Sequence, residues 1–345
     1  MGEIVAERLR ACCVLLALLP LSGCYLLQAA GGQADVAARS EPIERVVADP
    51  GTPEATRARL ELAQQVRAYA VDELGLPDGR SFRSYADLGR PYAVWNVVAT
   101  AEFSVEPLRW CFPVAGCVAY RGYFDESQAR AFAQRLARRG DDVTVGGVAT
   151  YSTLGRLSDP LFNTMLGWDE TRFAGTIFHE LAHERLYVPG DSEFSEAFAS
   201  VVEREALRLW LLARGDDAGV ERQRASTARE AEFAALLRSA RQRLGRLYAS
   251  DADATTLRIE KQREFGRLKF EYTLLRARWG GYAGYDGWFA RTLNNAHLAA
   301  AATYHDCVPG LQRELAAAGS LQAFYVRADA LAELPPAERR AVVCR

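Results

Sequence analysis

Two histidines that flank a glutamate are the residues of this chain best suited to chemistry. His179 and His183 are four residues apart, and Glu180 directly follows the first. Four residues turn an α-helix through a little over one revolution, so both imidazoles would project from one face and could share a metal ion. Glu180 would then lie beside that ion. The spacing therefore predicts a metal site with a carboxylate next to it.

The segment His179-Glu180-Leu181-Ala182-His183 is the HExxH arrangement of zinc peptidases. Two neutral imidazoles bind Zn²⁺, which makes a water molecule acidic enough for the glutamate to take its proton. The chain holds only four histidines, so chance explains this spacing poorly. The alternatives are two histidines on an ordinary helix and a site that keeps the motif without activity.

A catalytic zinc needs three protein ligands, so the motif requires one more donor. His297 and His305 are the only other histidines, and both lie far downstream. Glu196 follows the motif more closely, on a helix that could fold back against the first. Small residues surround it and would let the two helices approach each other. We therefore expect a site made of two histidines and Glu196.

Two further carboxylates on the same segment have alternative roles. Glu193 could replace Glu196 as the third ligand. Glu203 lies two turns beyond Glu196 and could accept a hydrogen bond from a ligand imidazole, which would orient the ring. A surface carboxylate of no special function is an equally good interpretation of Glu203.

The N-terminus has the pattern of a lipoprotein signal. Two arginines precede an apolar run over residues 11–20, which suits a secretory signal but is too short to span a bilayer. The run leads into Leu21-Ser22-Gly23-Cys24, which looks like a bacterial lipobox. We expect residues 1–23 to be removed and Cys24 to be lipidated. An ordinary signal peptide with an incidental cysteine is the alternative.

The residue after the cysteine bears on location. Tyr25 is not the aspartate that usually retains lipoproteins in the inner membrane. The expected location is therefore the bacterial cell envelope, on an outer-membrane lipid anchor that faces the periplasm.

Four cysteines remain in the mature chain. An even number in an oxidising compartment suggests disulfides, and four thiols allow three pairings. Proximity in the sequence favours Cys111 with Cys117 and Cys307 with Cys344, while free buried thiols are the alternative.

Composition indicates one large folded domain. The chain has 345 residues, of which 49% are hydrophobic and 25% charged, enough for a sizeable core. The formal net charge of -2 gives no reason to expect a nucleic-acid partner. Residues 24–53 are rich in alanine and glycine and are expected to be a tether between the lipid and a single catalytic domain over residues 54–345.

The first part of this domain, about residues 80–155, is expected to contain the strands. Residues 93–101 and 116–124 are rich in branched and aromatic side chains, and residues 142–155 continue the pattern through two glycines. A helix that begins after Asp125 interrupts them. The end of the last strand could pair with an extended peptide, which makes Tyr151, Ser152 and Thr153 candidate substrate-binding residues.

The rest of the domain is expected to be helical. A short helix should start at Ser158-Asp159-Pro160, and two active-site helices should fill residues 169–214, capped by Asp169 and Asp191. Apolar residues then recur every three or four positions over residues 220–279, which predicts a long antiparallel helical hairpin. The C-terminal helices should fill residues 284–345 and include one from Trp288 to Tyr304. The fold class is thus α+β and predominantly helical.

Several motifs together resemble a known family. They are the lipobox Cys24, Trp110 to Cys117, Tyr120 to Phe124, Tyr151 to Gly155, Asp159-Pro160, Phe178 to His183, Glu196 to Ala199 and Leu293 to Ala296 with Tyr304 and Val308-Pro309. This pattern is similar to that of the predicted bacterial zinc aminopeptidase lipoproteins over nearly the whole mature chain. The resemblance implies a gluzincin-like metallopeptidase with a zincin-like core and with zinc on His179, His183 and Glu196.

The chain departs from better-known gluzincins at two points. Ser200 occupies the position where these enzymes often have an aspartate that orients a ligand histidine. The Gly-x-Met-Glu-Asn segment, with which alanyl-type aminopeptidases hold the free amine of the substrate, has no counterpart. An endopeptidase that acts on envelope proteins by the same mechanism is therefore an alternative to an aminopeptidase. A non-catalytic envelope lipoprotein that zinc stabilises is another.

The expected reaction is hydrolysis of a peptide or protein substrate. Glu180 would take the proton of a water molecule and deliver it to the leaving amine. Tyr304 and His305 are the candidate donors to the oxyanion, although they could equally just pack in the C-terminal helices. Zn²⁺ is the expected cofactor, and the membrane is the other expected partner.

Overall fold

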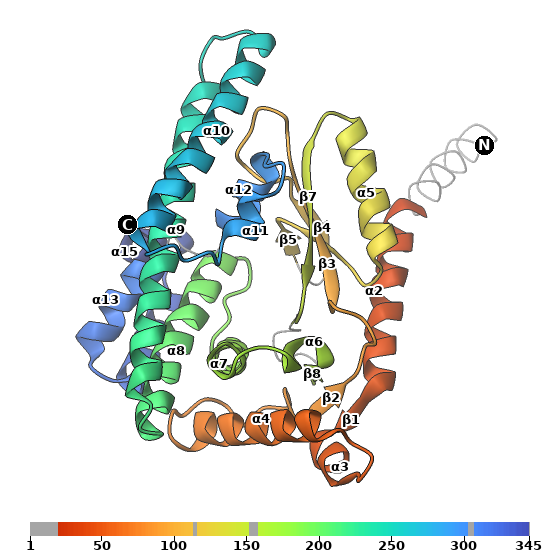
Figure 1. Ribbon diagram of the computed structural model, residues 1–345, viewed down its shortest axis with the longest axis vertical. Coiled ribbons are helices and arrows are strands. Elements are labelled where there is room, and N and C mark those ends of the chain that lie inside the picture. The colour runs from red at the N-terminus through yellow and green to blue at the C-terminus, as the bar shows by residue number, and fades with distance from the viewer. Residues whose placement is uncertain (1–19, 113–115, 152–157, 303–306, 345) are drawn as a thin grey trace, which may run out of the picture.

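The computed structural model describes residues 20–112, 116–151, 158–302 and 307–344. Helices predominate, and the described strands form three small sheets (Figure 1). The α+β, predominantly helical class expected from the sequence is therefore confirmed. Among the described helices, none combines the length and apolar character that a bilayer crossing requires.

The segment expected to be a tether is folded instead. It forms helix α2 (Pro20–Arg39), strand β1 (Ser40–Pro42) and helix α3 (Ile43–Ala48), and β1 pairs with β2 (Ser84–Ala86). Val36 and Ile43 are 1% and 0% exposed. Gly32 lies so close to the ring of Phe124 that a Cβ at this position would clash with it. A glycine that suggested flexibility in the sequence thus allows close packing, which corrects the expectation of a tether.

The central sheet has the order β6-β3-β7 and is antiparallel throughout. Its strands are β3 (Val94–Thr100), β6 (Arg121–Tyr123) and β7 (Asp142–Val148). Helix α5 (Glu126–Arg138) covers one face and α12 (Asn295–Ala302) lies on the other (Figure 1). The side chain of Asp125 accepts a hydrogen bond from the Gln128 amide at the start of α5, as the cap pattern predicted.

Two strand predictions are corrected at their ends. The expected strand over residues 116–124 is divided between β5 (Gly116–Val118), which pairs with β4 (Trp110–Phe112), and β6. Strand β7 ends at Val148 rather than continuing to residue 155. Gly147 approaches the ring of Tyr92, so one of the two glycines does mark a close contact.

The short helix expected from Ser158 begins later. The Asp159 carbonyl accepts a hydrogen bond from the Phe82 amide, and the Ser158 hydroxyl donates to the Arg80 carbonyl. These bonds hold the chain extended into β8 (Leu161–Phe162), which pairs with β2. Helix α6 (Asn163–Leu166) follows it.

Two helices at the centre of the molecule have the expected caps. Helix α7 (Glu170–Arg185) begins after Asp169 and α8 (Ser192–Ala213) after Asp191, and each aspartate accepts an amide hydrogen bond. The two helices pack closely on each other, and α4 (Glu54–Asp72) lies against α7 (Figure 1). The largest hydrophobic core of the described residues forms where they meet. Helix α7 ends at Arg185.

The predicted hairpin is present as α9 (Asp217–Tyr248) and α10 (Ala254–Arg278), which pack against each other (Figure 1). The expected helix from Trp288 to Tyr304 is wrong, because α11 (Asp286–Phe289) and α12 are separate. Between them, the Asn294 side chain donates to the Val143 carbonyl at 2.9 Å and the Asn295 amide to Asp142 at 2.9 Å. These bonds to β7 interrupt the helix.

The C-terminal helices are α13 (Val308–Ala318), α14 (Leu321–Ala332) and α15 (Pro336–Val343). One disulfide joins Cys111 of β4 to Cys117 of β5, and a second joins Cys307 to Cys344 across α13 to α15. This is the pairing that proximity in the sequence favoured.

Candidate metal centre

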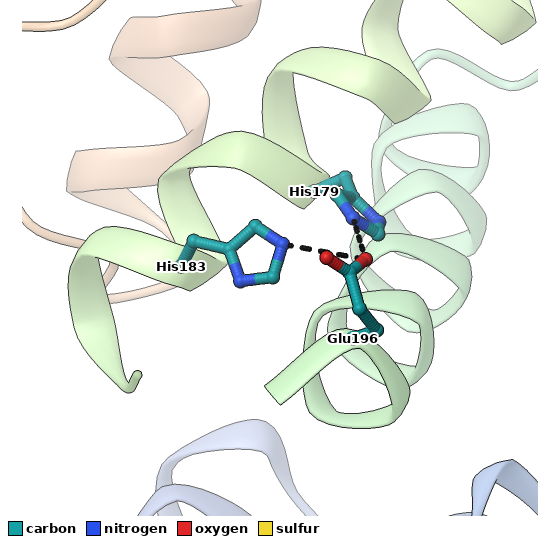
Figure 2. A group of neighbouring side chains, drawn as sticks. All are labelled: His179, His183 and Glu196. Carbon is teal, nitrogen blue, oxygen red and sulfur yellow. Dashed lines mark hydrogen bonds and ion pairs between the residues drawn. The ribbon is translucent and has the colours of Figure 1, made fainter. Parts of the chain in front are cut away.

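Helices α7 and α8 bring two imidazoles and one carboxylate together. His179 and His183 project from one face of α7 toward Glu196, which lies near the start of α8 (Figure 2). The Glu196 Oε2 atom lies 3.3 Å from Nε2 of His179 and 3.6 Å from Nε2 of His183. One donor atom from each residue lies within 4.8 Å of the others. This separation allows all three to bind one cation, so the donor set fits a metal ion.

Small side chains allow the helices to approach. Gly175 of α7 faces Glu203 of α8, and a Cβ at this glycine would lie 3.1 Å from Oε1 of Glu203. Ala197 and Ala199, which follow Glu196 on α8, are buried. The small residues around Glu196 therefore have the packing role that the sequence suggested.

Glu203 fixes the orientation of one imidazole. The Nδ1 atom of His179 lies 2.9 Å from Oε2 of Glu203. If Nδ1 carries the ring proton and donates it there, Nε2 presents its lone pair toward Glu196. A hydrogen-bonded carboxylate behind a ligand imidazole is the usual partner of a metal-binding histidine. Glu203 thus acts where Ser200, at the position expected for an aspartate, does not.

The runner-up ligand is directed elsewhere. Glu193 forms an ion pair with Arg340 of α15. It also lies beside the Cys307–Cys344 disulfide rather than the histidines. The structure therefore favours Glu196 over Glu193.

The cluster is strongly polarised by its own charges. Burial alone would lower the pKa of His179, but the carboxylates of Glu196 and Glu203 outweigh it and raise that pKa well above its ordinary value. Burial raises the pKa of Glu196, but the two imidazoles lower it by more, so that the pKa falls to about 2. Three carboxylates, including Glu180, thus surround the two rings, and a cation is the natural complement of this charge.

Glu180 is half-buried on α7, next to His179. Its negative charge contributes to the raised pKa of His179 and also acts on Tyr120. The carboxylate therefore lies within electrostatic reach of both His179 and Tyr120.

Tyr120 is a site residue that the sequence analysis did not single out. It lies between β5 and β6, and its side chain is 39% exposed. The protein around its hydroxyl raises the pKa of Tyr120 to about 12, and the charges of Glu196 and Glu180 add to this rise. Tyr120 is therefore a neutral hydrogen-bond donor at physiological pH. Its position in the motif from Tyr120 to Phe124 is the feature of the sequence that could have indicated it.

Tyr151, a candidate substrate-binding residue, has a packing role in the fold. Its hydroxyl donates to Oε1 of Gln33 at 2.6 Å, and its ring stacks on Phe162. These contacts attach α2 to β8. The other candidates Ser152, Thr153, Tyr304 and His305 lie outside the described residues, and Cys24 lies in α2.

The fold and the site together define a predominantly helical α+β protein whose two central helices carry a three-donor cluster. The chain belongs to a family described as "Putative aminopeptidase", whose model matches residues 24–343. Membership of this family supports a peptidase activity. A search of the curated proteins found no match, and a search of the solved structures found none either.

Proposed function

We propose that this protein is a zinc-dependent peptidase in which His179, His183 and Glu196 hold the metal and Glu180 is the general base. The observation that carries this proposal is the convergence of the three donors within 4.8 Å, with Glu180 adjacent on the same helix. Imidazole and carboxylate donors in this number suit a catalytic zinc, because they leave a coordination position for water or substrate. The family assignment independently supports peptidase activity.

Each residue has a role in the proposed reaction. A bound zinc would supply Lewis acidity, which polarises the scissile carbonyl and makes water acidic near neutral pH. Glu180 takes the proton of the attacking water and then donates it to the leaving amine. Glu203 keeps His179 in the ligating orientation through Nδ1. Tyr120, protonated at neutral pH, donates a hydrogen bond to the carbonyl oxygen as negative charge develops on it.

The family description favours an aminopeptidase, and an endopeptidase of the same mechanism is the second candidate. The two differ in whether the substrate needs a free N-terminal amine. Peptides of one sequence, with and without an N-terminal acetyl group, would separate them.

We also propose that lipid on Cys24 anchors the protein in the outer membrane, facing the periplasm. Leu26 and Leu27 lie two and three positions after this cysteine and are 45% and 74% exposed on α2. Apolar side chains next to a lipidated residue would face the bilayer surface rather than water. Globomycin treatment that left the size of the protein unchanged would contradict lipidation.

The central test combines metal content with hydrolysis. The mature chain should bind about one zinc per molecule and hydrolyse unblocked peptides. Glu180→Gln should keep the zinc and lose hydrolysis, because it removes the base but no ligand. Glu205→Gln, which removes an α8 carboxylate paired with Arg208, should change neither.

Two outcomes would contradict the proposal. Loss of zinc in Glu180→Gln would show that Glu180 is not separate from the ligands. Tight zinc binding by the unchanged protein without hydrolysis of any peptide would instead favour the non-catalytic, zinc-stabilised lipoprotein.

A further inference from the structure

A cavity of about 410 Å³ opens between the central sheet and α12. Its walls are small or apolar where β3, β7 and α12 face each other, including Val98, Val148 and Ala299 to Ala301. Trp288 also lines it. Pockets for small molecules usually have 300–1,000 Å³, so this one could hold a few amino-acid residues but not a folded protein segment.

Tyr120 connects this cavity to the metal centre. It lines the cavity, and its hydroxyl is close enough to Glu196 and Glu180 for their charges to act on it. A peptide whose scissile bond lay at the histidines could therefore extend past Tyr120 into the cavity.

The described lining of the cavity carries one positive charge, at the exposed side chain of Arg291. Arg291 is the one charged side chain among the described residues that line it, and no described aspartate or glutamate does so. The described residues also provide no carboxylate partner for the Arg291 guanidinium, in contrast to many arginines of this chain. His297 lines the cavity as a neutral ring, with Nδ1 2.7 Å from the Asn294 side-chain oxygen and Nε2 3.2 Å from the Thr144 hydroxyl.

This charge selects which end of a peptide fits. A free N-terminal ammonium would need a carboxylate partner, whereas a C-terminal carboxylate matches an unpaired guanidinium. From the position, size and charge of the cavity we propose that it binds the C-terminal part of a short peptide, with Arg291 paired to the terminal carboxylate. This inference rests on the proposed peptidase function, because it places the leaving side of the substrate in the cavity and predicts a preference for short peptides with free C-termini.

The test measures binding rather than hydrolysis. Trialanine and its C-terminal amide would be titrated by calorimetry into the zinc-loaded mature chain carrying Glu180→Gln, which should bind peptides without cleaving them. Trialanine should bind at least about tenfold more tightly than the amide, because a charge-assisted hydrogen bond is lost with the carboxylate.

Variants of Arg291 should change this ratio. Adding Arg291→Gln should bring the ratio of the two affinities close to one, and Arg291→Lys should keep part of it by retaining the charge. Arg313→Gln, which removes an exposed arginine of α13, is the matched control and should keep the full ratio.

Equal affinity for the acid and the amide, or an unchanged ratio in Arg291→Gln, would overturn the inference. Failure of the proposed function would look different: the unmodified chain would cleave neither peptide while the preference for the acid persisted. In that case the cavity would still be a carboxylate site, but not one that serves peptide hydrolysis.

Discussion

At the scale of single residues, Glu203 shows how one hydrogen bond can orient an imidazole. Its carboxylate lies 2.9 Å from Nδ1 of His179, on the far side of the ring from Glu196. The position of Glu203 in the sequence is compatible both with a partner of a ligand imidazole and with a surface carboxylate. Only the contact between α7 and α8 decides in favour of the partner, because spacing within one helix does not show what lies opposite.

Glu203→Ala should weaken zinc binding by about 10- to 100-fold, the usual effect of removing such a partner. The ring would lose the bond that fixes its tautomer and orientation. Competition with a chelator measures the affinity, and Glu205→Ala on the same helix is the control. An unchanged affinity would mean that His179 needs no partner to ligate.

Tyr120→Phe should lower kcat/KM for peptide hydrolysis by about 10²–10³-fold, as removal of a donor to a developing oxyanion does. Zinc content should not change, because the hydroxyl is not among the converging donors. Tyr282→Phe, at a similarly exposed tyrosine, is the control. Equal loss of activity and zinc in Tyr120→Phe would assign it a structural role instead.

His297 should make stability depend on pH. Burial lowers its pKa to about 4, the positive charge of Arg291 acts in the same direction, and Asp142 opposes them. The unfolded chain, with an ordinary value near 6.5, then binds this proton at higher pH than the folded chain does. Stability should therefore fall as pH decreases from about 6.5 to about 4, by about 3 kcal/mol from this group.

Urea unfolding of the metal-free protein at several pH values measures this effect. His297→Gln should show a shallower decrease than the unchanged protein over the same window, since other titrating groups remain in both. Parallel curves for the two proteins would show that His297 is not the group responsible.

At the scale of elements, the site depends on how closely α7 approaches α8. Gly175→Leu should push the helices apart, because even a Cβ at this position would lie 3.1 Å from Glu203. Overpacking of this kind costs about 1–3 kcal/mol of stability, and zinc affinity should fall with it.

Gly266→Ala is an informative control, since this α10 glycine lies in a helix and a Cβ there would meet nothing within 4 Å. It should stabilise the protein by about 0.4–1 kcal/mol without an effect on zinc. Denaturant unfolding and chelator competition on both variants provide the comparison. Retention of full zinc affinity by Gly175→Leu would show that the helix separation is not critical.

Sequence patterns predicted the elements whose signals are local. The aspartate caps of α5, α7 and α8 and the apolar periodicity of α9 and α10 lie within the segments that they define. The failures occurred where distant contacts decide. The break between α11 and α12 depends on bonds from Asn294 and Asn295 to β7, and the folding of residues 24–48 depends on pairing with β2.

The same distinction holds for the site. His179, Glu180 and His183 were evident because helical spacing alone puts them together. Tyr120 was not evident, because it lies between β5 and β6, far from α7 in the sequence, and only the tertiary fold brings it near Glu180 and Glu196. A short motif can thus identify candidate residues on one helix but not those that a separate part of the fold brings next to them.

At the scale of the whole molecule, the Cys307–Cys344 disulfide closes the C-terminal helices into a loop. The two cysteines are 37 positions apart; α13 packs on α8, and Arg340 of α15 forms an ion pair with Glu193 of α8. The double variant Cys307→Ser/Cys344→Ser should lose about 2–4 kcal/mol of stability, since the unfolded chain is no longer restrained. Denaturant unfolding without reductant measures the loss.

The exposed Cys111–Cys117 disulfide, which joins β4 to β5, provides a comparison. Cys111→Ser/Cys117→Ser opens a loop of only six positions and should have a smaller effect. A larger loss from this pair would show that the two disulfides act through native contacts rather than through chain entropy.

The packing of α2 limits how far the folded protein could extend from a lipid anchor on Cys24. This helix begins next to the proposed lipidation site, and Val36 and the following strand β1 are built into the body of the protein. With so little free chain between the lipid and the fold, the candidate metal centre would be held at a nearly constant distance and orientation relative to the bilayer. A peptidase held in this way would act on substrates that diffuse close to the membrane surface, not on those farther away in the periplasm.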